Sequence, residues 1–308
     1  MRFSITKLLP LFAVALFTVN SFAGEACLST GISVEDAEKA LSPILGKAKV
    51  VGVADAPIEG FYEVDIYNRG KVFPIYLDCN KKFVISGEII DLTKGKSITR
   101  ERMKELASKA KEIEQKQIEE KEKQLEKLLG KEKVEKLKKV APKSFLKNVN
   151  VVELKNVPEP NIIIGNPKAK YNVIIIEDPE CPACAMMHDE IVKAVEKRND
   201  IKFEIYLFPL SFHKHAKGIT QNIICASSQK EKAEILHKSF ENVKQRNQEG
   251  LASLEKECKE AEKTIKEVSG FARRVKLTGT PTIIFPPGLS LTGVLQADDI
   301  IKIVDALK

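Results

Sequence analysis

Residues 174–184 read IIIEDPECPAC, and this stretch decides the fold. Its apolar, β-branched start predicts a buried strand that ends at Asp178-Pro179. The segment that follows, 185–198, has the composition of a helix. A strand, a Cys-x-x-Cys motif and a helix in this order indicate a thiol redox site rather than a chance pair of cysteines.

The two cysteines of this motif are predicted to have different roles. Cys181 falls at the N-cap of the expected helix, and Pro182 falls at its first position, where a missing N–H costs nothing. Unpaired backbone N–H groups and the positive end of the helix dipole favour a thiolate at Cys181, which is the attacking form of a thiol. Cys184 can reach back to resolve a mixed disulfide. We therefore expect a redox-active Cys181–Cys184 pair with Cys181 as nucleophile and Cys184 as resolving thiol.

A second stretch, residues 278–285 (TGTPTIIF), is a turn that leads into another apolar strand. With the Cys-x-x-Cys motif it resembles the thioredoxin superfamily, in which Thr-Pro before such a strand forms a cis-proline loop facing the two cysteines. The resemblance implies that Pro281 is cis and that Thr280 offers backbone pairing to the substrate chain. An X-Pro bond is otherwise mostly trans.

The first residues have the pattern of a secretory signal peptide. Arg2 and Lys7 precede an apolar run that is shorter than the ~20 residues a membrane span needs. Residues 21–23 (SFA) then precede an expected cleavage site after Ala23. The sequence therefore predicts an exported protein.

Cysteine content and charge narrow the function further. The chain has six cysteines, an even number that indicates disulfides in an exported protein, although spacing alone cannot choose the pairs. The net charge is +7, but the lysines are spread along the chain and aromatic residues do not interleave with them. Nucleic-acid binding is therefore not expected.

Residues 24–97 are expected to form a small α+β domain. Ser33 is the predicted N-cap of a helix, and four strand-like segments follow it. The segments are 49–53, 61–67, 72–77 and 83–90. Such a sheet has little core of its own and an open edge, and pairing with a second copy would solve both problems.

This small domain, a linker helix and a C-terminal thioredoxin fold together resemble the periplasmic disulfide isomerase C/G (DsbC/DsbG) family. Segments 58–64 (IEGFYEV) and 83–92 (FVISGEIIDL) carry the N-terminal part of the resemblance. It implies a cystatin-like α+β dimerisation domain, a V-shaped homodimer and a periplasmic location. It also implies a DsbD-like membrane thiol reductase as the partner that keeps the Cys181–Cys184 pair reduced.

Residues 98–158 are predicted to be a charged helical linker and a Pro-containing connector, with a break at Gly130. The apolar stripe of this helix is incomplete, which favours a solvated linker over a coiled coil. Residues 159–308 form the expected catalytic domain, an α/β thioredoxin fold with a helical insertion at about 211–274. Its last edge strand is expected at 293–295.

The DsbC/DsbG resemblance also implies a structural disulfide. Cys225 and Cys258 lie in the helical insertion and match the family's disulfide in order and location. Two unpaired buried thiols are the alternative interpretation. Cys27 and Cys79 then remain as a candidate pair in the N-terminal domain, which departs from the family pattern.

Two residues near the motif are candidates for tuning the thiols. Asp178 matches the Asp-x-x-Cys pattern of the family, and its alternative role is to cap the strand end. His188 lies one helical turn after Cys184, where the family often has a histidine. A helix-surface position is the favoured interpretation of His188.

Metal binding is the competing chemistry for this motif. Cys181, Cys184 and His188 are soft ligands that Cu(I) accepts, and Met186 and Met187 are nearby. A structural zinc site would require a second pair of ligands at suitable spacing, and the sequence shows none. The strand–motif–helix context favours redox chemistry, so neither a metal nor a diffusible cofactor is expected.

The expected function is that of an exported disulfide isomerase or reductase acting on unfolded or misoxidised exported proteins. Three alternatives stay open. One is a DsbA-like thiol oxidase, which would not need the N-terminal domain. Another is a Cu(I)-binding periplasmic chaperone. The third is a chaperone whose dimer cleft holds unfolded chains and whose thiols are secondary.

Overall fold

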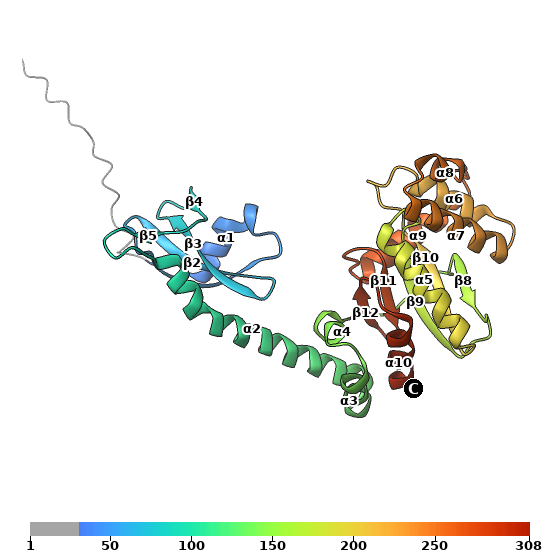
Figure 1. The fold of residues 1–308 in the computed structure, drawn as a ribbon, viewed down its shortest axis with the longest axis horizontal. Coiled ribbons are helices and arrows are strands. Elements are labelled where there is room, and N and C mark those ends of the chain that lie inside the picture. Colours follow the sequence, from blue (N-terminus) through green and yellow to red (C-terminus); the bar gives the residue numbers. More distant parts are fainter. Residues whose placement is uncertain (1–30) are drawn as a thin grey trace, which may run out of the picture. The chain divides into compact units, whose positions relative to one another are not determined.

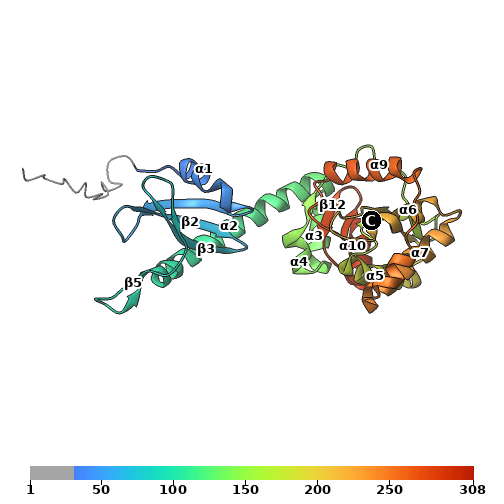
Figure 2. The ribbon, with the colours of Figure 1, turned by 90° about the horizontal axis from the view of Figure 1, so that it is seen from above.

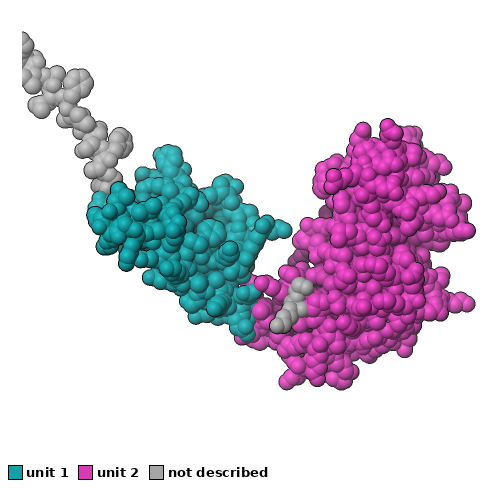
Figure 3. Space-filling model, viewed as in Figure 1, with its two compact units in different colours: residues 1–116 teal, residues 117–308 magenta. Residues whose placement is uncertain are grey.

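The computed structural model describes residues 31–308, apart from the side chains of 143–144. These residues form two compact units, shown in different colours in Figure 3. Unit 1 ends at Lys116 and unit 2 begins at Gln117, within one long helix. None of the helices within the described range has the length and hydropathy of a membrane-spanning segment.

Two predictions from the sequence fall outside the described residues. The signal peptide and its cleavage after Ala23 are one of them. The other is the Cys27–Cys79 disulfide, because Cys27 lies outside the described part of the chain. Both stay predictions.

Unit 1 is an antiparallel meander covered by a helix on each face (Figures 1 and 2). The sheet has the order β1-β2-β3-β4. Its strands are β1 (Lys49–Asp55), β2 (Phe61–Asn68), β3 (Lys71–Asp78) and β4 (Val84–Ile85). Helix α1 (Val34–Leu45) begins at Ser33, whose Oγ accepts the N–H of Asp36 at 3.0 Å, as predicted. Ala37 and Leu41 of α1 are buried in the core of this unit.

The predicted strand at 83–90 is mostly absent. Of this segment, only β4 joins the sheet, where it pairs with β3. β5 (Ile90–Asp91) and β6 (Lys96–Ser97) form a separate two-stranded hairpin. The intervening Ser86 and Gly87 have low strand propensity, and glycine weakens a strand interior. The edge of the sheet is therefore short.

Helix α2 (Ile98–Leu129) covers the face of the sheet opposite α1 with its first half. Side chains alternate along β2, so that Val64 faces α1 while Glu63 and Asp65 point to the other face. Arg102 of α2 binds Glu63 at 2.6 Å, and Lys109 binds Asp65 at 3.1 Å. This half of α2 is therefore packed, in contrast to the expected solvated linker.

The end of the predicted linker belongs to unit 2. Gly130, with φ of 83°, separates α2 from α3 (Lys131–Val140), and α4 (Lys143–Asn148) follows. Apolar residues of this segment join the main core of unit 2, and they are Leu125, Val134, Leu137, Phe145 and Val149. The ring of Phe145 meets that of Phe285 edge to face with centroids 6.0 Å apart. The connector is thus part of the folded unit.

The sheet of unit 2 has the order β7-β12-β11-β9-β10-β8. Its strands are β7 (Asn150–Val151), β8 (Ile162–Gly165), β9 (Tyr171–Glu177), β10 (Ile201–Leu207), β11 (Thr282–Phe285) and β12 (Leu289–Thr292). β9 runs parallel to β10 and antiparallel to β11. The apolar run that opens the deciding stretch is therefore a central strand, buried on both faces.

Helices cover both faces of this sheet. Those outside the insertion are α5 (Pro182–Lys197) and α10 (Ala297–Leu307). Those between β10 and β11 are α6 (Ala216–Cys225), α7 (Gln229–Gln245), α8 (Gln248–Ser253) and α9 (Ala261–Arg274). Val173 and Ile175 of β9 pack in the core on the side of α5 and α10, and Ile174 and Ile176 pack on the side of α9. Figure 2 shows α9 and α5 on opposite sides of the sheet.

The last strand is displaced from its predicted position. The sequence predicted an edge strand at 293–295, whereas β12 spans Leu289–Thr292. The turn at 286–288 lets β12 pair at once with β11, and Gly293, with φ of 124°, follows the strand directly. The hairpin is therefore tighter than expected.

Candidate functional site

The two motif cysteines lie where β9 gives way to α5 (Figure 1). β9 ends at Glu177 and α5 begins at Pro182, with Cys181 as its N-cap in extended geometry. Both cysteines carry free thiols. Cys181 is 7% exposed and Cys184 is fully buried, so Cys181 is the thiol with access to solvent.

The Thr-Pro stretch meets these cysteines from the neighbouring strand. The Thr280–Pro281 bond is cis, and it precedes β11, whose Thr282 pairs with Ile176 of β9. The Sγ of Cys181 lies 3.6 Å from the carbonyl oxygen of Thr280. Sheet pairing thus brings together two motifs that are far apart in the sequence.

The two thiols have opposite acidities. A hydrogen bond from Cys184 and the backbone N–H groups of Cys184 and Ala183 lower the pKa of Cys181 to about 5, against the opposing effect of burial. Burial raises the pKa of Cys184, and its hydrogen bond with Cys181 and the negative charge of Glu177 raise it further. The backbone N–H of Asp178 contacts the Sγ of Cys184 at 3.5 Å. One thiol is therefore ionised at neutral pH and the other holds its proton.

Glu177 is a site residue that the sequence reasoning missed. Its side chain is completely buried, and neither carboxyl oxygen has a hydrogen-bond partner within the described residues. Burial raises its pKa well above the ordinary value, and the charges of Cys181 and Asp178 raise it further. The signal was an acidic residue at the end of an otherwise apolar strand. Its charge also raises the pKa of Cys184, so Glu177 lies next to the thiols.

Asp178 fixes the turn before the thiols. Its carboxylate accepts the N–H of Glu180 at 2.7 Å and the N–H of Leu210, and Nδ1 of His213 lies 3.1 Å from its Oδ1. Burial raises its pKa in spite of these contacts. Asp178 therefore caps the strand end and ties the turn to the loop after β10.

Glu180, also missed, ties the same turn to the insertion. Its Oε2 accepts the N–H of His215 at 2.6 Å and the N–H of Ala216 at 2.9 Å, at the start of α6. His215 is the N-cap residue of α6; it is buried, and its ring lies 2.6 Å from the carboxylate of Glu255. The insertion is thus anchored to the thiol site by carboxylates.

His188 is buried rather than on the helix surface. It is 3% exposed, and its ring packs against Phe240 and His237 of α7 with centroid distances of 5.1 and 5.7 Å. Burial lowers its pKa to about 4. Its ring contacts therefore hold α5 against α7, which makes packing its evident role.

The predicted disulfide of the insertion is present. Cys225 and Cys258 are bonded, with Cα atoms 6.6 Å apart, and they join the end of α6 to the segment before α9. Glu260 approaches the Sγ of Cys258 at 3.2 Å. Within the described residues, these three form the one group of potential metal ligands with all donor atoms within 4.8 Å, and its two sulfurs are joined to each other.

The solved structures that this chain is similar to include the following three. Proteus mirabilis ScsC in a transitional conformation has 18% identity and a TM-score of 0.42, over 47% of this chain and 72% of that one. A periplasmic thioredoxin-like protein from Salmonella enterica serovar Typhimurium has 21% identity and a TM-score of 0.41, over 50% and 93%. Pseudomonas aeruginosa DsbA2 has 20% identity and a TM-score of 0.41, over 50% and 97%.

Two protein-family models match separate parts of the chain, while no curated protein matches it. Residues 161–308 match the thioredoxin-like domain, and this range holds the two thiols and the cis proline. Residues 30–100 match the N-terminal domain of the disulfide bond isomerase protein. The chain therefore belongs to the thioredoxin-like thiol:disulfide oxidoreductases, and its N-terminal domain makes it a DsbC-like member of that superfamily.

Proposed function

We propose that this protein is a periplasmic disulfide isomerase and reductase that acts on misoxidised exported proteins. The observation that carries the proposal is the pairing of an acidic thiol, Cys181, with a buried and protonated one, Cys184, in a chain that also has a DsbC-type N-terminal domain. The asymmetry supplies a nucleophile and a resolving group, and the extra domain supplies a means of holding a client.

The first step is attack by Cys181 on a client disulfide. With a pKa of about 5, Cys181 is almost entirely thiolate at neutral pH. Its sulfur forms a bond to one client sulfur, the client S–S bond breaks, and the other client sulfur leaves as a thiolate. The product is a mixed disulfide, with no net change in the number of disulfides.

The mixed disulfide then has two fates. In isomerisation, another client thiolate attacks the client sulfur, forms the new client disulfide and releases Cys181 unchanged. In reduction, Cys184 attacks Cys181, which releases the client thiol and leaves a Cys181–Cys184 disulfide that has given two electrons to the client. Glu177 takes the proton of Cys184 in that step. The DsbD-like membrane reductase is the proposed source of electrons for the next cycle.

The loop at Thr280 and Pro281 is the proposed docking point for the client backbone. The Thr280 carbonyl already lies within reach of Cys181, so a chain aligned along this loop presents its disulfide to the nucleophile. Asp178 acts as a positioning residue, because it fixes the turn that carries Cys181.

The N-terminal domain is the proposed homodimer contact. Large apolar side chains are exposed around its short edge strand, and they are Phe83 (70%), Ile85 (43%), Ile90 (52%) and Leu92 (90%). β4 leaves an open sheet edge beside them. A second copy of this domain would cover both the apolar side chains and the unpaired backbone groups.

Substitution of each thiol in the full-length chain tests the proposal. Cys181→Ser is expected to abolish both reduction of insulin and reactivation of scrambled ribonuclease. Cys184→Ser is expected to retain attack and to accumulate mixed disulfides, visible by mass spectrometry after acid quenching. Equal loss of activity in both variants, without trapped adducts, would show that the roles are assigned wrongly.

A DsbA-like oxidase is the second candidate, because the acidity of Cys181 favours it. A low thiol pKa stabilises the reduced form and makes the Cys181–Cys184 disulfide a stronger oxidant. Equilibration with glutathione separates the candidates, together with refolding of reduced and of scrambled ribonuclease. An oxidase would accelerate only the reaction that starts from reduced substrate.

A further inference from the structure

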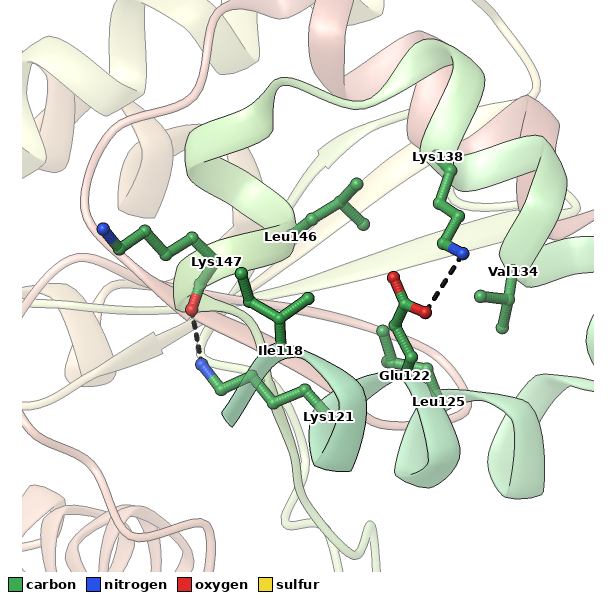
Figure 4. A pocket seen from close by; sticks show the side chains of 8 residues that line it. All are labelled: Ile118, Lys121, Glu122, Leu125, Val134, Lys138, Leu146 and Lys147. Carbon is green, nitrogen blue, oxygen red and sulfur yellow. Dashed lines mark hydrogen bonds and ion pairs between the residues drawn. The ribbon is translucent and has the colours of Figure 1, made fainter. Parts of the chain in front are cut away.

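The segment between the two matched family domains builds a pocket of its own. Residues 101–160 fall outside both matched ranges. Within unit 2, the end of α2 together with α3 and α4 encloses a cavity of about 280 Å³ (Figure 4). This cavity is separate from the thiol site, because none of its lining residues belongs to the Cys-x-x-Cys turn or to the cis-proline loop.

The walls of the pocket are apolar. Ile118 and Leu125 come from α2, Val134 comes from α3 and Leu146 comes from α4. Leu125 and Val134 are almost completely buried, whereas Ile118 and Leu146 are half-buried and point toward each other in Figure 4. A ligand with an apolar body would gain free energy by covering these side chains.

At the rim of the pocket, one lysine is paired with a carboxylate and another bonds to a backbone carbonyl. Lys138 of α3 reaches Glu122 of α2 at 3.1 Å, so this pair is neutral as a whole. Lys121 donates to the backbone carbonyl of Lys147, and the described residues place no carboxylate in an ion pair with it. Burial and the charge of Lys147 lower the pKa of Lys121. A partly desolvated ammonium beside an apolar slot favours an anionic partner.

We propose that this pocket binds an amphiphilic monocarboxylate, with its saturated tail between Ile118 and Leu146 and its carboxylate on Lys121. The volume is about twice that of a 150 Å³ cavity that holds benzene, so a tail of about ten carbons fits. Glu122 on the same rim is paired with Lys138, so Lys121 rather than Lys138 is the cation that remains for the carboxylate. The proposal is independent of the thiol chemistry.

Titration calorimetry of the full-length protein with decanoate tests this binding. Decanol and decyltrimethylammonium are the matched neutral and cationic probes, all used below their micelle concentrations. Decanoate is expected to bind with one site per chain, decanol about ten- to a hundred-fold more weakly because it lacks the charge-assisted contact, and the cation not at all. Equal binding of the three probes, or no binding of decanoate, would overturn the proposal.

Variants assign the binding to the pocket. Lys121→Gln is expected to reduce decanoate affinity to that of decanol, and Lys121→Arg, which keeps the charge, is expected to restore it. Ile118→Phe fills the slot from a half-exposed position and is expected to abolish binding of both decanoate and decanol. Lys123→Gln, an exposed position on the same helix outside the pocket, is the matched control and should bind as the wild type. Circular dichroism and the melting temperature check that each variant is folded.

Two further arms identify the source of the carboxylate. Co-sedimentation with phosphatidylglycerol vesicles is expected to be absent, since one slot on one lysine recognises a free amphiphile rather than a membrane surface. An apolar peptide with a free C-terminus is expected to bind more weakly than decanoate. Preference for the vesicles or for the peptide would refute the ligand class. Decanoate binding that persists unchanged in Lys121→Gln and Ile118→Phe would refute the site.

Discussion

Replacing Cys184 by alanine should raise the pKa of Cys181. The hydrogen bond from Cys184 is the largest of the contributions that lower this pKa from 9.0 to about 5. The whole decrease corresponds to about 5 kcal/mol of preference for the thiolate. A hydrogen bond to a charged group contributes about 1.5–3 kcal/mol, so its loss should move the pKa of Cys181 from about 5 to about 6 or 7.

Two assays read this pKa. Thiolate absorbance near 240 nm gives the midpoint directly. The rate of alkylation by iodoacetamide gives it independently, since only the thiolate reacts. Cys184→Ser is the matched control, because its hydroxyl keeps a donor next to Cys181 and should keep the pKa close to the wild-type value. A midpoint in Cys184→Ala equal to that in Cys184→Ser would show that the backbone N–H groups of α5 alone make Cys181 acidic.

The same acidity predicts how the stability of the reduced protein depends on pH. The folded pKa of Cys181 is below its unfolded value of about 9, so the unfolded chain binds more protons between pH 5 and 9. The stabilisation is complete above pH 9 and is lost as the pH falls through 5. At pH 7 it is about 3 kcal/mol. In urea unfolding, the stabilities of reduced wild type and Cys181→Ser should differ increasingly with pH, with this contribution reaching about 3 kcal/mol at pH 7 and about 5 kcal/mol above pH 9.

Three further predictions concern other residues. Glu177→Leu should stabilise the protein by about 1–3 kcal/mol in urea unfolding, because it removes a buried carboxyl without hydrogen-bond partners. The same substitution should slow the release of mixed disulfides by Cys184. Destabilisation would mean that the carboxyl is paired. The wild-type protein should lose about 3 kcal/mol of its free energy of unfolding between pH 7 and 4, since the pKa of His188 is about 4 in the folded state and ordinary in the unfolded state. His188→Phe should abolish this loss. Parallel curves of stability against pH for wild type and variant would contradict this. Phe83→Glu combined with Leu92→Lys should give a monomer by light scattering. This monomer should still reduce insulin but should no longer reactivate scrambled ribonuclease. An unchanged dimer would mean that the contact lies elsewhere.

The local patterns of the sequence predicted most of what surrounds the thiols. Strand β9, helix α5 and the Cys181 N-cap follow from an apolar run, a proline and a helix-compatible segment that are contiguous in the chain. The cis bond before Pro281 and the Cys225–Cys258 disulfide followed instead from resemblance to a known family. From the spacing of the six cysteines alone, this disulfide could not be distinguished from the other possible pairings.

Contacts between distant segments were beyond this reasoning. No sequence pattern distinguishes Glu180 from the other acidic residues, and only the packing of α6 against the turn shows that it accepts two backbone N–H groups there. His188 was placed on the helix surface because α7, which covers it, belongs to the insertion, and helix periodicity says nothing about which helix packs against which. The first half of α2 was read as solvated because its partners, Glu63 and Asp65, are charged and lie on a distant strand.

The placement of the reacting groups separates reduction from isomerisation. Cys181, Cys184, Glu177 and Pro281 all lie in unit 2, so every bond that breaks or forms in thiol–disulfide exchange is served by this unit alone. Reduction needs one encounter with a client, whereas isomerisation needs the client to stay while Cys181 attacks repeatedly. The described part of unit 1 holds none of these four residues, so its proposed contribution to isomerisation is to retain the client or to bring a second copy. Substitutions on the exposed apolar residues of unit 1 should therefore reduce isomerisation and leave insulin reduction intact, and a parallel loss of both would mean that unit 1 supports the fold of the thiol site instead.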